Sequence, residues 1–217
     1  MVGCRYRKVG ARQTRLRVAV ACELSFMPHT SYFLALRARI AQLEFLLPKQ
    51  PPNDETEEQQ QQDNIRAFLL LCHAEVETFV EDLAKILGES LVAELKNPRL
   101  GTRFSRSHAE TAERRYVDAI SSNHGVKESN LLAMFGLFGF SEKTFVDIDP
   151  AFLSEFNSYG STRGDSAHKG AARATRRLFG NSQKIKIERL LNLLAGLESE
   201  VRRACINGLL APNARDI

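Results

Sequence analysis

The sequence predicts an all-α protein, built as an up-and-down helical bundle of about four main helices with short additional helices. Three observations favour this fold class. Long segments carry apolar residues at alternating spacings of three and four, which is the period of one helix face. Leu, Ala, Glu, Arg and Gln, which favour helices, are frequent, and Trp is absent. No segment shows the sustained apolar–polar alternation of a half-buried strand.

Residues 1–26 form a basic arm that precedes the predicted helical domain at 27–217. Six Lys or Arg residues in the arm stand against Glu23 alone, a balance of +5, so the rest of the chain sums to −1. The apolar run at 18–22 is too short for the core of a secretory signal. We expect a disordered extension whose charge can attract nucleic acid, and Met27 offers an alternative start.

The first half of the domain contains two predicted amphipathic helices separated by a linker. Residues 31–47 carry an apolar stripe that begins at Phe33, and Pro48 ends this helix. Residues 48–62 are rich in proline, then acidic, then a run of glutamines, and we expect a flexible linker there whose glutamines are able to start the next helix. Residues 63–88 have the widest apolar stripe of the chain, and Gly88 is the expected C-cap.

The second half of the domain contains shorter predicted elements and one long helix. We expect a short helix or turn at 89–100, a polar helix at about 106–121 and a short buried helix at 129–139. Asp149 and Pro150 are suited to begin a helix that Gly160 ends. The last helix is predicted at about 182–210, where a leucine-rich stripe recurs.

An Arg and a His with four residues between them, Arg163 and His168, follow Gly160 directly. Cleavage of RNA by 2′-hydroxyl attack needs a proton acceptor near pH 7, which His supplies, and positive charge on the phosphoryl oxygens, which Arg supplies. Asp165 lies three residues before His168, a spacing at which it can orient the imidazole on a helical turn. On one straight helix, Arg163 and His168 point about 140° apart. Either the turn is irregular or a second protomer completes the site.

Other residues compete with this pair or extend it. Arg103 and His108 have the same spacing but fall in a predicted loop. His73 and Glu75 are candidates for lining a cleft, although they lie on opposite flanks of the 63–88 helix, about 160° apart, and cannot share a metal ion. The candidates for RNA phosphate contacts are Arg173, Arg176 and Arg177, for which a solvated basic connector is the equal alternative.

A bundle with R-x-x-x-x-H just before its last long helix resembles the HEPN superfamily, and the segment RGDSAHK at 163–169 is similar to its RiboL-PSP-HEPN and MAE_28990-like branches. The helix DNIRAFLLLCHAEVETFVEDLA at 63–84 also resembles the helix that opens the core of these domains. The resemblance covers about residues 31–210. It implies a metal-independent endoribonuclease of the toxin or defence type, with Arg163 and His168 in its site. The polar position that the family places directly after the Arg is Gly164 here, and Asp165 follows it.

The resemblance also implies partners: an RNA substrate, a second copy of the chain whose motif shares the cleft, and an antitoxin or regulatory protein. No cofactor and no metal site are expected, since Walker-type, HExxH and GxSxG motifs are absent and the four cysteines lack CxxC spacing. Cys72 and Cys205 fall in apolar helical patterns, so buried free thiols in a reducing, cytoplasmic setting are expected. No apolar run is long enough to span a membrane.

Two other function classes remain open. The chain can be a non-catalytic helical module that binds RNA, nucleotide or a partner and keeps the Arg–His pair as a phosphate clamp. It can also be a purely structural dimerisation bundle. Substitution of His168 separates the clamp from the enzyme, because a clamp still binds RNA when a nuclease has stopped cutting.

Overall fold

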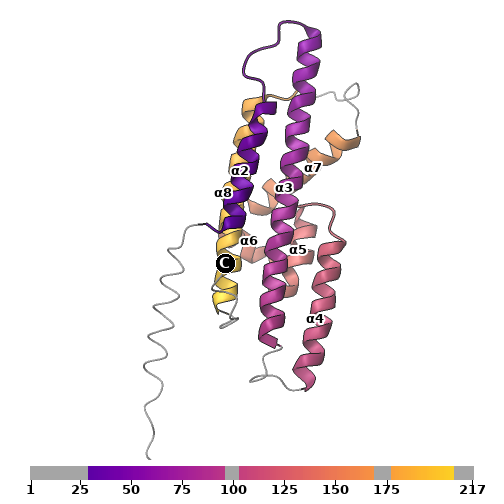
Figure 1. Cartoon of the computed structure of the whole chain (residues 1–217), viewed down its shortest axis with the longest axis vertical. Helices are drawn as coiled ribbons and strands as arrows, with labels where there is room; N and C mark the ends of the chain where they lie inside the picture. Colours follow the sequence, from indigo (N-terminus) through magenta and orange to yellow (C-terminus); the bar gives the residue numbers. More distant parts are fainter. Residues whose placement is uncertain (1–28, 96–102, 169–176, 208–217) are drawn as a thin grey trace, which may run out of the picture.

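One helix, α3, runs along the bundle, and the other helices pack around it (Figure 1). The computed structural model describes residues 29–95, 103–168 and 177–207, with the backbone alone for 94–95, 103–106, 109, 162–168 and 206–207. The elements are α2 (Ser31–Leu43), the 3-10 turn η1 (Glu44–Leu46), α3 (Glu55–Leu95), α4 (Arg103–Ser121), α5 (Glu128–Phe135), the 3-10 turn η2 (Gly136–Phe138), α6 (Glu142–Ile148), α7 (Phe152–His168) and α8 (Gly180–Asn207). These ranges contain helices and no strand, which confirms the all-α class.

The long helices alternate in direction, as an up-and-down bundle requires. In Figure 1, α2 rises, α3 descends, α4 rises beside the lower part of α3, and α8 descends beside α2. Side-chain contacts fix the antiparallel pairing of α2 with α8. The N–H of Thr30, before α2, donates to Glu198 in the second half of α8 (3.0 Å), and Lys184 near the start of α8 donates to Glu44 directly after α2 (2.6 Å). The short helices α5 and α6 and the helix α7 connect α4 with α8.

A buried carboxylate anchors the beginning of α2. Glu198 is 1% exposed and accepts hydrogen bonds from both the backbone N–H and the hydroxyl of Thr30. The same hydroxyl accepts from the N–H of Phe33 (3.3 Å), so Thr30 caps α2. The Nδ1 atom of His29 lies 2.9 Å from the second oxygen of Glu198. These contacts satisfy a carboxylate that would be costly to bury alone.

Helix α3 begins eight residues earlier than the sequence predicts, which corrects the linker at 48–62. Asp54 accepts from the N–H of Glu57 (2.8 Å), while the Glu57 carboxylate accepts from the N–H of Asn53 (2.8 Å). Glu55, Glu57 and Glu58 also place negative charge in the first turn, where the helix dipole favours it. The acidic and glutamine residues at 55–62 therefore start the helix, and the non-helical connection narrows to 47–54.

The glutamine run contributes to tertiary structure. The side-chain amide of Gln62 donates to the carbonyl of Leu178 (2.9 Å) and accepts from the N–H of the same residue (2.8 Å). Gln61 donates to the carbonyl of Gln50 (3.1 Å). The N-terminal turns of α3 are thus joined to the segment that precedes α8 and to the chain that follows α2.

The core follows the predicted apolar stripes. The largest fully buried side chains are Phe33, Ile65, Phe68, Leu131, Met134, Phe135, Phe145, Phe152, Phe156, Ile187, Leu194 and Leu197. Cys72 and Cys205 are free and buried, as predicted. Among the described helices, none has both the length and the apolar character that crossing a membrane requires.

Gly88 does not end α3, contrary to the prediction that it is a C-cap. The helix continues to Leu95, and the ring of Tyr116 from α4 packs directly on the glycine. A Cβ atom built at Gly88 lies 2.8–2.9 Å from three ring atoms of Tyr116. The glycine is needed for the close approach of α4 to α3, and not for its backbone freedom.

We expect Gly88→Ala to lower the free energy of unfolding by about 1–3 kcal/mol, because the new methyl group must displace the Tyr116 ring. This net loss remains after the roughly 1 kcal/mol that alanine gains in helix propensity. Urea unfolding followed by circular dichroism measures it. Gly136→Ala is the matched control: a Cβ built there meets no heavy atom within 4 Å, so stability should hold or rise. Equal stability of the Gly88→Ala and wild-type proteins would show that Tyr116 moves aside without cost.

Candidate functional site

The helix that carries Arg163 and His168, α7, is anchored at its beginning by Asp149. The Asp149 carboxylate accepts from the N–H of Ala151 (2.8 Å) and from the Arg189 guanidinium of α8 (2.7 Å). The bond from Ala151, followed by the interaction with Arg189, holds the pKa of Asp149 below its usual value. The carboxylate thus caps the first turn of α7 and joins it to α8, although the helix proper begins at Phe152.

The first half of α7 is embedded in the core. Phe152 stacks on Phe156 at 4.7 Å between ring centroids and lies 5.2 Å from Phe145 of α6. Phe152 and Phe156 are fully buried, and Tyr159 nearly so. The direction of α7 is therefore fixed by aromatic packing before the chain reaches Arg163.

Gly160 lies inside α7, which corrects the prediction that it ends the helix. The backbone continues as a helix to His168, so Arg163, Asp165 and His168 all belong to one element. Their side chains lie outside the described residues. In one continuous helix, positions 163 and 168 are about 140° apart around the axis, whereas 165 and 168 are one turn apart. Figure 1 shows this end of α7 reaching outward past α3.

His73 belongs to α3, and its side chain packs at the interface between α3 and α7. It is 2% exposed, stacks on Tyr159 at 5.1 Å between ring centroids with an interplanar angle of 17°, and has Nδ1 3.7 Å from the Glu77 carboxylate. Tyr159 is one helical turn before Arg163. The structure therefore places His73 on the side of α3 that faces the motif helix, but within the packed interior.

Glu75 lies on the other side of α3. Its carboxylate accepts from Nε of Arg39 in α2 at 3.0 Å. The structure does not bring Glu75 together with His73 or with α7, in agreement with their predicted separation around the helix.

The remaining sequence candidates divide into three groups. Arg173 and Arg176 lie outside the described residues. Arg177 forms an ion pair with Glu58 at 3.2 Å and lies 5.7 Å from the ring centroid of Phe179, so the helix α3 and a neighbouring ring hold it. Arg103 and His108 are both in α4. This corrects the predicted loop at Arg103, whereas His108 lies within the range of the predicted polar helix; its side chain is exposed.

Burial suppresses the chemistry of the thiol that neighbours His73. Desolvation, followed by the charges of Glu75 and Glu44, raises the pKa of Cys72 to about 12. The thiolate is the nucleophilic form of cysteine, so Cys72 is inert at neutral pH. Within the described ranges, no three His, Cys, Asp or Glu side chains are grouped as a metal site would need.

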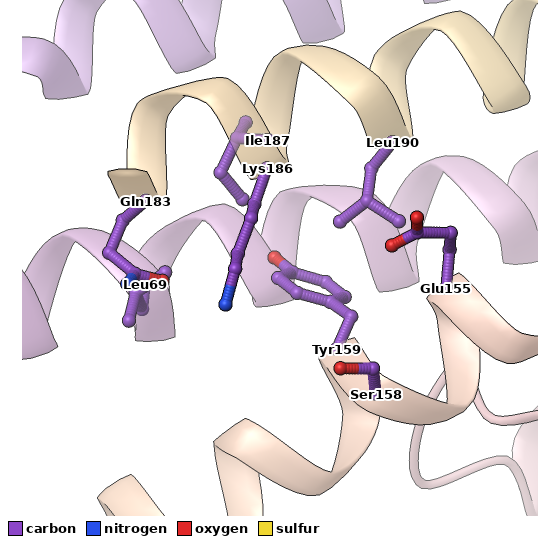
Figure 2. Close-up of a pocket in the computed structure, with 8 residues that line it drawn as sticks. All are labelled: Leu69, Glu155, Ser158, Tyr159, Gln183, Lys186, Ile187 and Leu190. Atoms are coloured by element: carbon purple, nitrogen blue, oxygen red, sulfur yellow. The ribbon is translucent and has the colours of Figure 1, made fainter. Parts of the chain in front are cut away.

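A pocket that the sequence analysis did not identify lies where α3, α7 and α8 meet (Figure 2). Its lining residues are Leu69 from α3, Glu155, Ser158 and Tyr159 from α7, and Gln183, Lys186, Ile187 and Leu190 from α8. The α7 and α8 residues recur at spacings of three and four, so each set follows one helix face. That pattern was visible in the sequence, but only the packing of three helices shows that the faces converge.

A protein-family model described as RiboL-PSP-HEPN matches residues 34–203 of the chain. The match begins within α2 and ends within α8, and it includes the whole of α7. No curated protein and no solved structure matches the chain.

His73 and Glu75 are the two residues of α3 that the sequence suggested as cleft-lining. Their replacement should lower the free energy of unfolding by different amounts. His73→Ala should lower the free energy of unfolding by roughly 2–4 kcal/mol, because it empties buried volume against Tyr159. Glu75→Ala removes a partly exposed ion pair and should cost about 1 kcal/mol or less. Thermal or urea unfolding measures both. A His73→Ala protein as stable as Glu75→Ala would contradict a packed, structural His73.

Proposed function

The chain belongs to the RiboL-PSP-HEPN family, and on that premise we propose that it is a metal-independent endoribonuclease that uses Arg163 and His168. The observation that carries the proposal is that one continuous helix, inside the matched range, holds both residues of the motif. The first half of this helix is seated in the core by Phe152 and Phe156. A rigid element is suited to hold reacting groups in a fixed geometry.

The reaction is a transesterification within the RNA strand. The imidazole of His168 accepts the proton of a ribose 2′-hydroxyl, and the 2′-oxygen forms a bond to the adjacent phosphorus. The bond from phosphorus to the 5′-oxygen breaks, and that oxygen takes a proton from an imidazolium. The products are a 2′,3′-cyclic phosphate and a 5′-hydroxyl. Arg163 stabilises the charge on the non-bridging oxygens of phosphorus during the transfer.

Asp165 is proposed to orient His168. The two positions are one turn apart in α7, a spacing at which a carboxylate can accept a hydrogen bond from an imidazole N–H and fix its tautomer. The other imidazole nitrogen then remains available as the base.

A homodimer is proposed to complete the site. Arg163 and His168 lie on different sides of a regular helix, so the two positions do not face the same point within one chain. A two-fold axis, in contrast, brings copies of both residues into one cleft. The apolar face of α7 is not available for this contact, because Phe152 and Phe156 are buried within their own chain. Two exposed apolar side chains, Phe179 directly before α8 and Ile185 near its beginning, are better suited.

The biological role that we propose is that of a toxin or defence effector acting on cytoplasmic RNA, restrained by an antitoxin or regulatory partner. Expression in a bacterial host distinguishes this role from a housekeeping one. The wild-type chain should arrest growth, and His168→Ala should not.

Purified protein should cleave labelled single-stranded RNA in the presence of EDTA and leave 2′,3′-cyclic phosphate ends. His168→Ala should lower the rate roughly 10²–10⁴-fold, the usual contribution of a general acid–base group. His108→Ala is the matched control, because His108 has the same spacing from Arg103 on a different helix; its rate should stay near wild type. Loss of activity in EDTA with recovery in magnesium would contradict the mechanism. RNA binding without cleavage by the wild-type chain would support the clamp instead.

Mixing two inactive variants tests the shared cleft. Arg163→Ala and His168→Ala chains, combined and allowed to exchange, should regain part of the wild-type rate, because some mixed dimers contain one intact Arg–His pair. Light scattering at micromolar concentration should give the mass of a dimer. A monomer, or a mixture as inactive as its components, would mean that each chain forms its own site.

A further inference from the structure

The side chain of Lys127, directly before α5, lies across Gly160 of α7, one turn before Arg163. A Cβ atom built at Gly160 is 2.6 Å from the Cγ atom of Lys127, 3.4 Å from its Cε atom and 3.6 Å from its Cδ atom. Gly160 is buried, whereas Lys127 itself is exposed. An aliphatic stem that covers a neighbouring surface while its ammonium stays in water is a common arrangement of lysine. Here the stem occupies the space that any larger residue at position 160 would need.

The backbone at Lys127 is held against α7 by Asn157. The side-chain oxygen of Asn157 accepts from the N–H of Glu128 (3.0 Å), and its amide nitrogen donates to the Glu128 carboxylate (2.8 Å). The carbonyl of Lys127 accepts from the N–H groups of Asn130 and Leu131 in the first turn of α5 (2.9 and 3.0 Å). The side chain of Lys127 therefore starts from a fixed backbone that is already docked on the motif helix.

The Lys127 side chain extends along α7 in the direction of the motif. The backbone beside it is attached at Asn157, and its stem crosses Gly160, which is three residues further along α7. In a regular helix, positions 160 and 163 are separated by a rise of about 4.5 Å and by about 60° around the axis. Their Cβ atoms are then about 5–6 Å apart. The ammonium, one bond beyond Cε, and position 163 are thus neighbours on one surface.

The charge of Lys127 remains available for a ligand. Lys184 is paired with Glu44 at 2.6 Å, but among the described residues no carboxylate forms such an ion pair with Lys127. The carboxylate of the next residue, Glu128, is bound by the amide of Asn157 instead. A lysine ammonium is a compact charge with three hydrogen-bond donors, which suits the oxygens of a phosphate.

We propose that Lys127 binds the RNA backbone at the phosphate next to the one that is cleaved, and that residue 160 is a glycine to admit its stem. The inference rests on the proposed function and adds a substrate contact to it. Arg163 acts on the scissile phosphate, and Lys127 lies one turn further from the C-terminal end of α7, so it contacts the neighbouring phosphate. Both residues belong to one chain, so this contact does not depend on which protomer supplies His168. A phosphate contact fixes the register of the strand without reading its sequence.

Binding is measured in the full chain carrying His168→Ala, so that it is separated from cleavage. The probe is a fluorescently labelled oligouridylate, followed by anisotropy over a range of salt concentrations. Lys127→Gln should weaken binding about fivefold at low salt and reduce the slope of log K against log salt by about 0.7, the value of one phosphate contact on a single strand. Lys127→Arg keeps the charge and should stay within about twofold of the parent chain. Lys143→Gln removes the same charge from an exposed position of α6 and is the matched control, with a change below about twofold.

Gly160→Ala tests the position of the stem without removing the charge. The new methyl group lies 2.6 Å from the Cγ atom of Lys127, so the side chain must leave its place. Alanine favours a helix more than glycine does, so circular dichroism should show no loss of helix. Oligouridylate binding should nevertheless weaken about fivefold, as for Lys127→Gln. In a chain that already carries Lys127→Ala, Gly160→Ala should weaken binding no further, because no stem remains to be displaced.

The steady-state kinetics of the chain with His168 intact give a second measurement. A contact to the phosphate beside the scissile one is equally strong in the ground state and the transition state. Lys127→Gln should therefore raise KM about fivefold and leave kcat within about twofold. A fall in kcat at constant KM would overturn the assignment to the neighbouring phosphate.

The binding outcomes separate the inference from the proposed function. No oligouridylate binding by the parent chain, or a loss in Lys127→Gln no larger than in Lys143→Gln, overturns the contact, whether or not the protein cleaves RNA. A further loss from Gly160→Ala in the Lys127→Ala chain also overturns it, because the methyl group then acts through something other than the stem. Salt-dependent binding that Lys127→Gln and Gly160→Ala both weaken supports the contact even if no cleavage in EDTA is found. In that case only the nuclease proposal fails.

Discussion

Helix α3 must be covered on several sides at once, and the arrangement of the other helices follows from this. Its 41 residues extend about 60 Å, and it carries fully buried side chains such as Phe68, Cys72, Val76 and Val80. A stripe this wide exceeds what one neighbouring helix can bury. Helices α2, α4, α7 and α8 all pack against it. Burial of this one surface therefore sets the positions of the remaining elements.

The place of the candidate site is a consequence of that packing. His73 of α3 stacks on Tyr159 of α7, and Asp149 joins the beginning of α7 to α8 through Arg189. The first half of α7 is thus fixed from two sides, and its second half carries the motif away from α3. The same junction leaves the pocket at Tyr159, because the three helices α3, α7 and α8 do not fill all the space where they meet.

Glycine and glutamine have roles here that their usual meaning in a sequence does not reveal. Gly88 ends no helix; it admits the ring of Tyr116. Gly160 likewise lies within α7, with Lys127 against it: a Cβ built there is 2.6 Å from the Lys127 Cγ atom. Gln62 resembles part of a linker but binds both backbone groups of Leu178. In each case a partner distant in sequence decides the role, and the local pattern contains no trace of that partner.

The sequence by itself determined the helical class, the apolar stripes, the burial of Cys72 and Cys205, and the order of the long helices, because these depend on the spacing of apolar residues along the chain. The family resemblance came from the Arg163–His168 motif and its place before the last long helix. It also separated His73 from Glu75, since helix geometry alone fixes their angle. Only the tertiary structure decided where α3 begins, that α7 continues through Gly160 to His168, and that Glu75 meets Arg39. Helix ends are decided by small differences between local preferences, and a few contacts with other elements outweigh them. The pocket could be found only in the tertiary structure, because its lining residues come from three helices and no single segment of the sequence contains them.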